Sequence, residues 1–251
     1  MRYLILSDIH ANGEALRAVR SHVRRKRYDR LVFLGDAVGY GASPNQVMAW
    51  VRGLDQDAVL VRGNHDRVCA GIDSAEYFNR YARQATEWTR EHLEDRHLAL
   101  LEGLPTGPVE LSPELAVCHG SPVDEDAYIF SAYEARLAFD AVPHRVVFFG
   151  HTHVPSMFML TDAAAGGELK ARMLSGRRVV VDLDPTTRYL VNPGSVGQPR
   201  DRDPRAAYAI YDDDCDRVYL YRVSYRAAAA RRRIIQAGLP PVLGDRLLYG
   251  A

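Results

Sequence analysis

The sequence lacks three features that would place it in a specialised class of protein. It has only three cysteines, Cys69, Cys118 and Cys215, whose spacing is not that of a metal site, which argues against a disulfide framework. Its 32 basic and 32 acidic residues give a formal net charge of zero, which argues against a broad surface for nucleic acid or anionic membrane. No apolar run approaches the length of a membrane span. The chain opens on a strand pattern, so no signal peptide is expected, and we predict a cytoplasmic protein with no obligatory nucleic-acid partner and no membrane attachment.

The composition is otherwise that of a globular protein, with 251 residues, 47% hydrophobic and 25% charged. This length suits one α/β domain over residues 1–251. In the first part of the chain, short β-branched runs alternate with stretches of helical spacing, which predicts a wound α/β architecture. The expected strands are 2–6, 31–34, 58–61, 115–118 and 145–149, and the expected helices are 14–26, 44–54, 74–101 with one break, and 133–141.

The second half changes character, because strand patterns there follow one another directly and are separated by Gly, Asp and Pro turns. We expect antiparallel neighbours that form a second sheet packed on the first, with an exposed hairpin tip at 162–168. After Tyr225 a basic helix is expected through Ala237, followed by a Pro-Pro tail. The expected strands are 156–160, 169–174, 178–183, 188–191, 207–212 and 217–223.

Histidines, aspartates and one asparagine gather where the predicted strands end. Carboxylate oxygens mixed with imidazole nitrogens suit Mn²⁺, Fe and Zn²⁺ rather than Ca²⁺. The set exceeds what one ion needs, so it points to a two-metal hydrolytic centre acting on a phosphate ester. The clusters are Asp8-Ile9-His10, Gly35-Asp36, Gly63-Asn64-His65-Asp66, His119 and Gly150-His151-Thr152-His153.

Side chains two apart in an extended chain project to the same side. Asp8 and His10 are therefore expected to converge on one ion, and His151 with His153 on a shared site. Cys118 must point away from His119 and face the core.

This ordered set of motifs resembles the calcineurin-like metallophosphoesterases. The segments 39–45 and 192–201 further resemble the compact bacterial branch related to the YfcE-type phosphodiesterases. The resemblance implies a four-layer α/β/β/α sandwich of two mixed sheets, with a binuclear metal centre at the strand ends. It implies two divalent ions, with Mn²⁺ favoured and Fe or Zn²⁺ as alternatives.

The resemblance also implies a role for each matching residue. One metal would be held by Asp8, His10, Asp36 and His153, and the second by Asp36, Asn64, His119 and His151. A hydroxide bridging the ions would be the nucleophile. His65 would be a non-ligand that protonates the leaving-group oxygen or stabilises its charge, with Asp66 orienting its ring.

Charge counting favours a phosphodiester as the substrate. Two divalent ions, two aspartates and a hydroxide leave a net charge of about +1, which matches a diester monoanion. In the protein-phosphatase branch an arginine follows the bridging aspartate, and Tyr40 stands in its place here. Arg62 remains as a phosphate ligand, and Arg200, or else Arg202 or Arg205, could reach the site from a later loop. The expected substrate is a small phosphodiester such as a cyclic or linear nucleotide.

Three alternatives stay open. The chain could be a phosphomonoesterase acting on a phosphoprotein or small ester, a diadenosine-polyphosphate hydrolase, or a non-catalytic protein-binding scaffold on this fold. The long apolar helix face suits a homo-oligomer. Its aromatic residues, Tyr77, Phe78, Tyr81 and Trp88, are interpreted as packing or a dimer face, with contact to a nucleoside as the alternative.

The remaining motifs have local interpretations. The turn 192–195 either lies at the mouth of the site or is only a tight turn. The basic stretches 24–27 and 231–233 are interpreted as solvated helix faces. The remaining histidines, His22, His92, His97 and His144, are interpreted as surface or satisfied residues.

Overall fold

The computed structural model describes residues 1–161 and 167–251. Its strands are β1 (Arg2–Leu6), β2 (Arg30–Phe33), β3 (Val59–Leu60), β4 (Val109–Ser112), β5 (Leu115–Val117), β6 (Val146–Phe148), β7 (Ser156–Thr161), β8 (Glu168–Met173), β9 (Arg178–Asp182), β10 (Arg188–Asn192), β11 (Ala206–Asp212) and β12 (Arg217–Val223). Its helices are α1 (Gly13–Val23), α2 (Pro44–Arg52), α3 (Asn64–Cys69), α4 (Arg80–His92), α5 (Asp95–Glu102), α6 (Ala132–Ala141), α7 (Ala227–Gln236) and α8 (Pro241–Tyr249).

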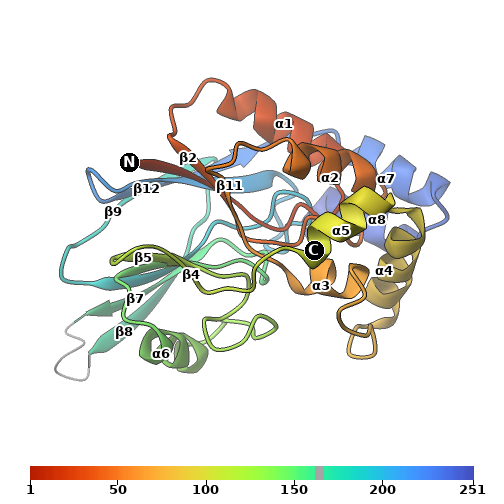
Figure 1. The fold of residues 1–251 in the computed structure, drawn as a ribbon. Helices are drawn as coiled ribbons and strands as arrows, with labels where there is room; N and C mark the ends of the chain where they lie inside the picture. The colour runs from red at the N-terminus through yellow and green to blue at the C-terminus, as the bar shows by residue number, and fades with distance from the viewer. Residues whose placement is uncertain (162–166) are drawn as a thin grey trace.

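The strands form two six-stranded mixed sheets, in the orders β3-β2-β1-β11-β12-β9 and β4-β5-β6-β10-β7-β8. Figure 1 shows the sheets stacked on each other, with α1 and α2 above the first and α6 below the second. Successive side chains of β1 point to opposite faces of the sheet, which explains why the sheet has a hydrophobic core on each side. Tyr3 and Ile5 enter the core between the sheets, whereas Leu4 and Leu6 enter the core beneath the helices. The four-layer α/β/β/α sandwich is confirmed.

The expectation that the second half builds a sheet of its own is wrong. Strands β9, β11 and β12 join the first sheet, and β7, β8 and β10 join the second. The reason is long-range pairing, since β11 lies antiparallel to β1, with Ile5 opposite Ala209. The local pattern predicts a strand but not its partner. The short strand β4 was not anticipated, and residues 162–166 of the expected hairpin tip lie outside the described residues.

The helices agree with the sequence except in three places. The expected break in 74–101 falls at 93–94, between α4 and α5, and the first of these begins only at Arg80. The short helix α3, which carries the Asn64–Asp66 motif, was not anticipated. The prediction of a tail after the two prolines is wrong, because Pro241 begins helix α8. Proline fits the first helical turn, where a backbone N–H has no partner within the helix.

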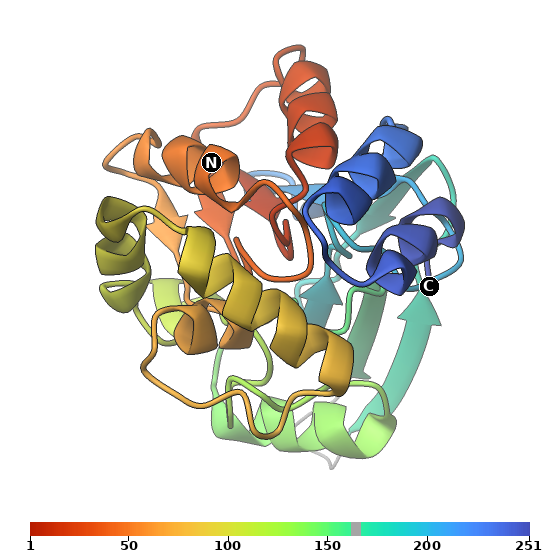
Figure 2. The same ribbon diagram turned by 90° about the vertical axis from the view of Figure 1, so that its right-hand side faces the viewer.

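Helices α7 and α8 pack together (Figure 2), and side-chain packing brings them to α4 and to Tyr40. These elements share an apolar cluster that includes Ala85 and Leu243. Phe78 and Trp88 pack against it, which supports the packing interpretation for these two residues, whereas Tyr77 and Tyr81 are exposed. The C-terminal helices therefore form one wall beside the loop that follows β2.

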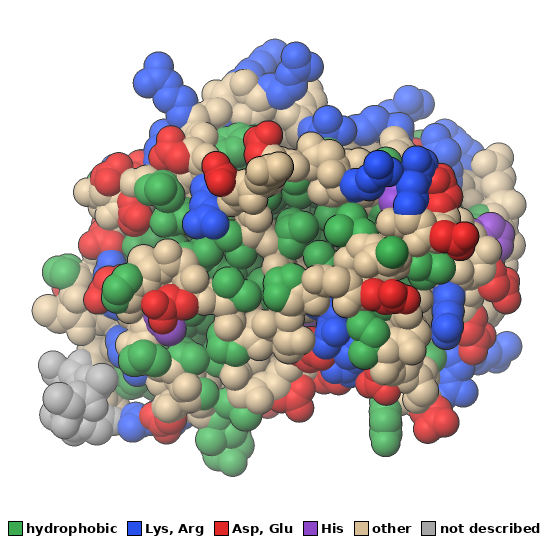
Figure 3. All heavy atoms as spheres, in the orientation of Figure 1, with side chains coloured by type: hydrophobic (Ala, Val, Ile, Leu, Met, Phe, Trp, Pro, Cys, Tyr) green, Lys and Arg blue, Asp and Glu red, His purple; other side chains and the backbone are tan. Residues whose placement is uncertain are grey.

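The basic stretches differ in their settings. Residues 24–27 follow the end of α1 rather than lying within it, and Figure 3 shows basic side chains gathered over α1 at the top of that face. In α7, Arg231 pairs with Asp245 and Arg233 pairs with Glu14.

No helix within residues 1–161 and 167–251 has the length and apolar character needed to cross a membrane.

Candidate metal centre

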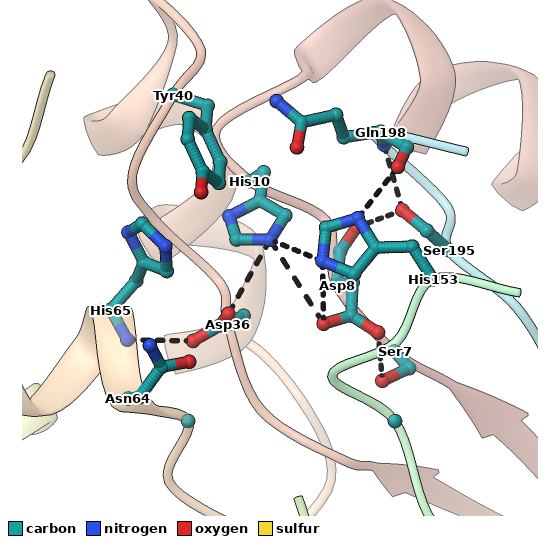
Figure 4. A network of polar contacts seen from close by, with 12 residues as sticks. Ser7, Asp8, His10, Asp36, Tyr40, Asn64, His65, His153, Ser195 and Gln198 are labelled. Atoms are coloured by element: carbon teal, nitrogen blue, oxygen red, sulfur yellow. Dashed lines mark hydrogen bonds and ion pairs between the residues drawn. The ribbon is translucent and has the colours of Figure 1, made fainter. Parts of the chain in front are cut away.

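The candidate ligands follow strands that run parallel to one another. Strand β1 is parallel to β2, β2 to β3, and β5 to β6. The carboxyl ends of these strands therefore lie at one edge of the two sheets. Figure 4 shows Asp8, His10, Asp36 and His153 meeting there.

Asp8, His10, Asp36 and His153 form the first group. The Nε2 atom of His153 lies 3.3 Å from Oδ1 of Asp8 and 3.1 Å from Nε2 of His10. The Nε2 atom of His10 lies 3.4 Å from Oδ2 of Asp36. All four side chains are buried, so water does not compensate their charges and lone pairs.

Asp36, His119 and His151 form the second group, so Asp36 belongs to both. The Nε2 atom of His119 lies 3.5 Å from Oδ2 of Asp36 and 3.2 Å from Oδ1 of Asn64. Within each group the offered ligand atoms lie within 4.8 Å of one another. The assignment of His153 to one ion and His151 to the other agrees with this grouping. The expectation that these two histidines share a site because they are two apart is wrong.

Backbone carbonyl groups hold all four ligand histidines. The Nδ1 atoms of His10, His119 and His153 contact the carbonyl oxygens of Val38, Leu34 and Gln198 at 2.9, 2.7 and 2.6 Å. The Nε2 atom of His151 contacts the carbonyl oxygen of Asp126 at 3.0 Å. A carbonyl oxygen only accepts, so each contacting nitrogen must be the N–H. When a ring is neutral, its other nitrogen is left as a lone pair, the arrangement found in metal-binding histidines.

The carboxylates supply the complementary evidence. Oδ1 of Asp8 and Oδ2 of Asp36 are buried, and neither has a hydrogen-bond partner among the residues that the structure describes. Such orphaned acceptors are destabilising unless a cation lies between them. The donor set, two carboxylates with four imidazoles and one amide, therefore fits divalent cations of the Mn²⁺, Fe or Zn²⁺ type.

The directions of the pKa shifts indicate that this site favours positive charge. Burial disfavours the ionised carboxylates, but the facing imidazoles, led by His153 and His119, hold the pKa of Asp8 and of Asp36 below the ordinary value. Burial would also lower the pKa of His119, yet Asp36 and Asp8 raise it to about 10. A bound cation would meet the same electrostatic demand.

Five of the ligand residues adopt left-handed backbone conformations. The φ angles of Asp8, His10, Asp36, His151 and His153 lie between 48° and 64°. Residues other than glycine rarely adopt this region, at about 1–3 kcal/mol each. Asp8 and His10 therefore converge through a sharp turn rather than through an extended strand. Gly63 permits the close approach of the loops, since a Cβ there would lie 2.1 Å from Oδ1 of Asp36.

His65 lies beside both groups on α3 without joining either. Its backbone N–H donates to Oδ1 of Asp36 at 2.9 Å, and its ring is 5.0 Å from that of His10 between centroids. Burial lowers the pKa of His65 to about 4. Phe78 covers the ring, with centroids 4.5 Å apart.

Asp66 does not orient the His65 ring. Its carboxylate accepts the backbone N–H groups of Asp36 at 2.8 Å, Val38 at 3.2 Å and Gly63 at 3.2 Å. The Nδ1 atom of His65 instead contacts the hydroxyl of Thr86, at 3.5 Å. Asp66 therefore holds the loop that carries Asp36.

The three expected substrate ligands have different settings. The ring of Tyr40 lies 4.7 Å from that of His10 and 4.4 Å from that of His65. Arg200 lies over Tyr40, 5.8 Å from the ring centroid, and contacts its hydroxyl at 3.5 Å. Arg62 instead pairs with Glu125 at 3.0 Å. Arg205 pairs with Asp203.

The loop 192–201 lies at the metal site, which decides between its two interpretations. The hydroxyl of Ser195 donates to the carbonyl of Asp8 at 2.8 Å, and the carbonyl of Gln198 accepts from His153. Cys118 is buried in the core under α6, as its position beside His119 predicted.

Three residues near the site, Tyr128, Phe130 and Arg246, are not marked by the sequence. Tyr128 stacks on His151 with centroids 4.0 Å apart, and Phe130 stacks on Tyr128 at 5.2 Å. Arg246, from the unanticipated α8, lies close enough to Arg200 that burial and this neighbouring cation lower its pKa. No sequence motif marks Arg246, because only tertiary packing brings α8 to the site.

Comparison with known proteins gives consistent results. Residues 1–215 match the model of the calcineurin-like phosphoesterase superfamily domain. A protein of Methanocaldococcus jannaschii is 34% identical over 251 residues, covering 98% of this chain and 97% of that protein. The crystal structure of a metallophosphoesterase from Sphaerobacter thermophilus is 40% identical with a TM-score of 0.86, covering 100% of this chain and 99% of that one. A Pyrococcus horikoshii structure shares the fold at 20% identity, with a TM-score of 0.77 and coverage of 100% and 98%.

Proposed function

Because this chain belongs to the calcineurin-like phosphoesterase superfamily, we propose that it is a binuclear-metal-dependent phosphodiesterase acting on a small phosphodiester. The proposal rests on one observation. Two carboxylate oxygens without hydrogen-bond partners among the described residues face the Nε2 atoms of His10 and His153, whose Nδ1 atoms are held by backbone carbonyl groups. We infer that Asp8, His10, Asp36 and His153 hold one ion. Asp36, Asn64, His119 and His151 hold the other, with Mn²⁺ favoured.

When bound, the two ions would supply a hydroxide nucleophile at neutral pH and stabilise charge on the phosphoryl oxygens. The chain's own residues do the rest. His65 is neutral near pH 7, since its pKa is lowered to about 4. A neutral imidazole donates a hydrogen bond to a developing oxyanion more readily than it transfers a whole proton. We therefore assign His65 to stabilising the leaving-group oxygen.

The diester preference rests on Tyr40. Its ring occupies the position next to His10 and His65 where an arginine would add positive charge. The stacked rings of Tyr128 and Phe130, both partly exposed beside His151, suit an aromatic ester group such as a nucleoside. The proposed substrate is thus a cyclic or linear nucleotide diester.

One observation favours a second candidate, a phosphomonoesterase or a hydrolase of oligophosphates such as diadenosine polyphosphates. Arg200 and Arg246 both lie close to Tyr40 and add positive charge beside it, and only Arg200 is suggested by the sequence. Two guanidinium groups suit a substrate with more than one negative charge.

The test uses metal-stripped protein assayed on a bis-aryl phosphodiester and on the matching aryl monoester, with Mn²⁺, Zn²⁺ or Fe²⁺ restored singly. A metal-dependent rate that favours the diester is expected. Preference for the monoester would select the second candidate. Absence of turnover on both, with two ions bound, would select the protein-binding scaffold.

We infer that residues 1–251 act as one domain, because α7 and α8 pack against α1 and the Tyr40 loop. A cytoplasmic location suits the three free cysteines. The exposed Tyr77 and Tyr81 suit contact with a second copy of the chain.

A further inference from the structure

A pocket of about 530 Å³ lies between the end of α1 and strands β9 and β12, and it shares no lining residue with the metal centre. This volume falls in the range of small-molecule sites. Its lining includes five basic residues, Lys26, Arg177, Arg178, Arg205 and Arg222. So dense a set of cations around one cavity is destabilising through mutual repulsion unless anions compensate it.

Two of the five cations are already neutralised within the protein. Arg222 has a fully buried side chain that pairs with Asp201. Arg205 pairs with Asp203 through Nη2 and Oδ2. These two ion pairs form a fixed wall of the pocket and contribute little net charge to it.

The other three cations have no such compensation. Among the residues that the structure describes, Lys26, Arg177 and Arg178 form no ion pair with a carboxylate. Lys26 lies over the ring of Tyr221, 4.5 Å from its centroid, and Arg178 lies 6.0 Å from the same centroid. Contact with one aromatic ring holds both cations at the pocket without cancelling their charge.

The positive potential of the pocket affects the pKa of His22. It lines the pocket, and its Nδ1 atom lies 2.8 Å from the hydroxyl of Tyr208. Its pKa is lowered, first by burial and then by the nearby charges of Lys26, Arg177 and Arg25. The pocket therefore disfavours a further positive charge and favours a negative one.

We propose that this pocket binds a small molecule bearing two or more phosphate groups, with Lys26, Arg177 and Arg178 as its cationic contacts. Guanidinium groups bind phosphate oxygens in a bidentate manner, and an ammonium group adds a point charge. Three cations match the charge of a diphosphate better than that of a single phosphate. This site is additional to the metal centre, where the phosphate ester would be hydrolysed.

Isothermal titration calorimetry of metal-free protein with inorganic pyrophosphate, in the presence of EDTA, tests the proposal. The parent chain is expected to bind, and the triple variant K26A/R177A/R178A to bind at least roughly tenfold more weakly. Arg177 and Arg178 are exposed, so their removal should leave the fold intact. Arg177→Ala alone provides a milder variant and should show an intermediate loss.

Two controls locate the binding. R52A/R80A/R232A removes three exposed arginines outside the pocket and should bind within about twofold of the parent. Arg200→Ala, at the metal centre, should also bind as the parent does. Absence of binding to the parent, equal binding by the triple variant, or loss on Arg200→Ala would each overturn the proposal. Tighter binding of a single-stranded oligonucleotide through the same three residues would overturn the assignment to a small molecule.

Discussion

The Nε2 atoms of His10 and His153 lie 3.1 Å apart, although 143 residues separate the two histidines in the chain. The Nδ1 atom of each ring donates to a backbone carbonyl, so neutral rings would place two lone pairs against each other. Such a contact is repulsive unless a cation lies between the nitrogens. Asp8 and Asp36 present their orphaned oxygens to the same space. A cation bound between these side chains would relieve both the repulsion and the unpaired carboxylate oxygens.

Divalent metal should stabilise the folded chain, because it binds the folded state and not the unfolded one. At 100-fold excess over the dissociation constant, the expected gain is about 2.7 kcal/mol. Thermal unfolding with and without Mn²⁺ measures it, together with metal content. The Asp36→Asn variant should hold fewer ions because Asp36 belongs to both groups, whereas Asp182→Asn, on the exposed strand β9, should match the parent. Full metal content in Asp36→Asn would contradict the shared-ligand assignment.

Replacement of His65 by alanine should abolish most turnover while leaving metal content unchanged. A group that stabilises a leaving oxygen contributes roughly 10²–10⁴-fold to the rate. Rates on the aryl esters, with metal content measured in the same sample, test this. His97→Gln serves as the control, since His97 is buried but contacts Asn45 away from the site. Loss of metal in His65→Ala would make His65 a ligand instead.

Arg200→Ala should lower kcat/KM by about 10–100-fold, because a hydrogen bond to a charged group contributes about 1.5–3 kcal/mol. Arg205→Ala is the matched control, since Arg205 pairs with Asp203 rather than facing Tyr40. The ratio of monoester to diester rates should fall in Arg200→Ala, because monoesters carry the extra charge. An unchanged kcat/KM would place Arg200 outside the substrate site.

Glu125→Ala should weaken binding of the ion held by His151 by about 10–100-fold. Arg62 and Arg67 both pair with Glu125, and the adjacent Asp126 carbonyl fixes the His151 ring. Without these ion pairs of Glu125, the Asp126 carbonyl is no longer held against the His151 ring. Metal titration followed by calorimetry measures the change. Glu134→Ala, which removes a helix cap in α6, should lower stability but not metal affinity.

Stability of metal-free protein should fall as the pH drops below 6.5, in part through His22. Its pKa in the folded chain is lowered by burial and by Lys26 and Arg177. Below 6.5 the unfolded chain therefore takes up a proton that the folded chain resists, which favours unfolding. Urea unfolding of the parent and of His22→Gln between pH 7.5 and 5 gives the dependence of the unfolding free energy on pH for each protein, and the parent should show the steeper fall. Parallel slopes would show that His22 does not contribute.

The sequence by itself predicted the candidate ligand set, because carboxylates and imidazoles at strand ends have few other uses in that order, and the structure brings these side chains into two groups. The motifs also determined the superfamily and hence the four layers, as the match over residues 1–215 confirms. Local periodicity located most strands and helices, since alternation and helical spacing depend on near neighbours alone. It could not show that β11 pairs with β1, because pairing depends on contacts between distant parts of the chain.

Only the tertiary structure decided which residues surround the candidate metal centre. Asp66 proved to hold backbone N–H groups rather than the His65 ring, since α3 turns its carboxylate toward the loop that carries Asp36. Arg62 pairs with Glu125 instead of facing the site, and Arg246 lies on helix α8, where the sequence predicted a tail. Each of these outcomes depends on burial and charge pairing between segments far apart in the chain. The pocket lined by Lys26, Arg177 and Arg178 forms in the same way, so no run of residues announces it.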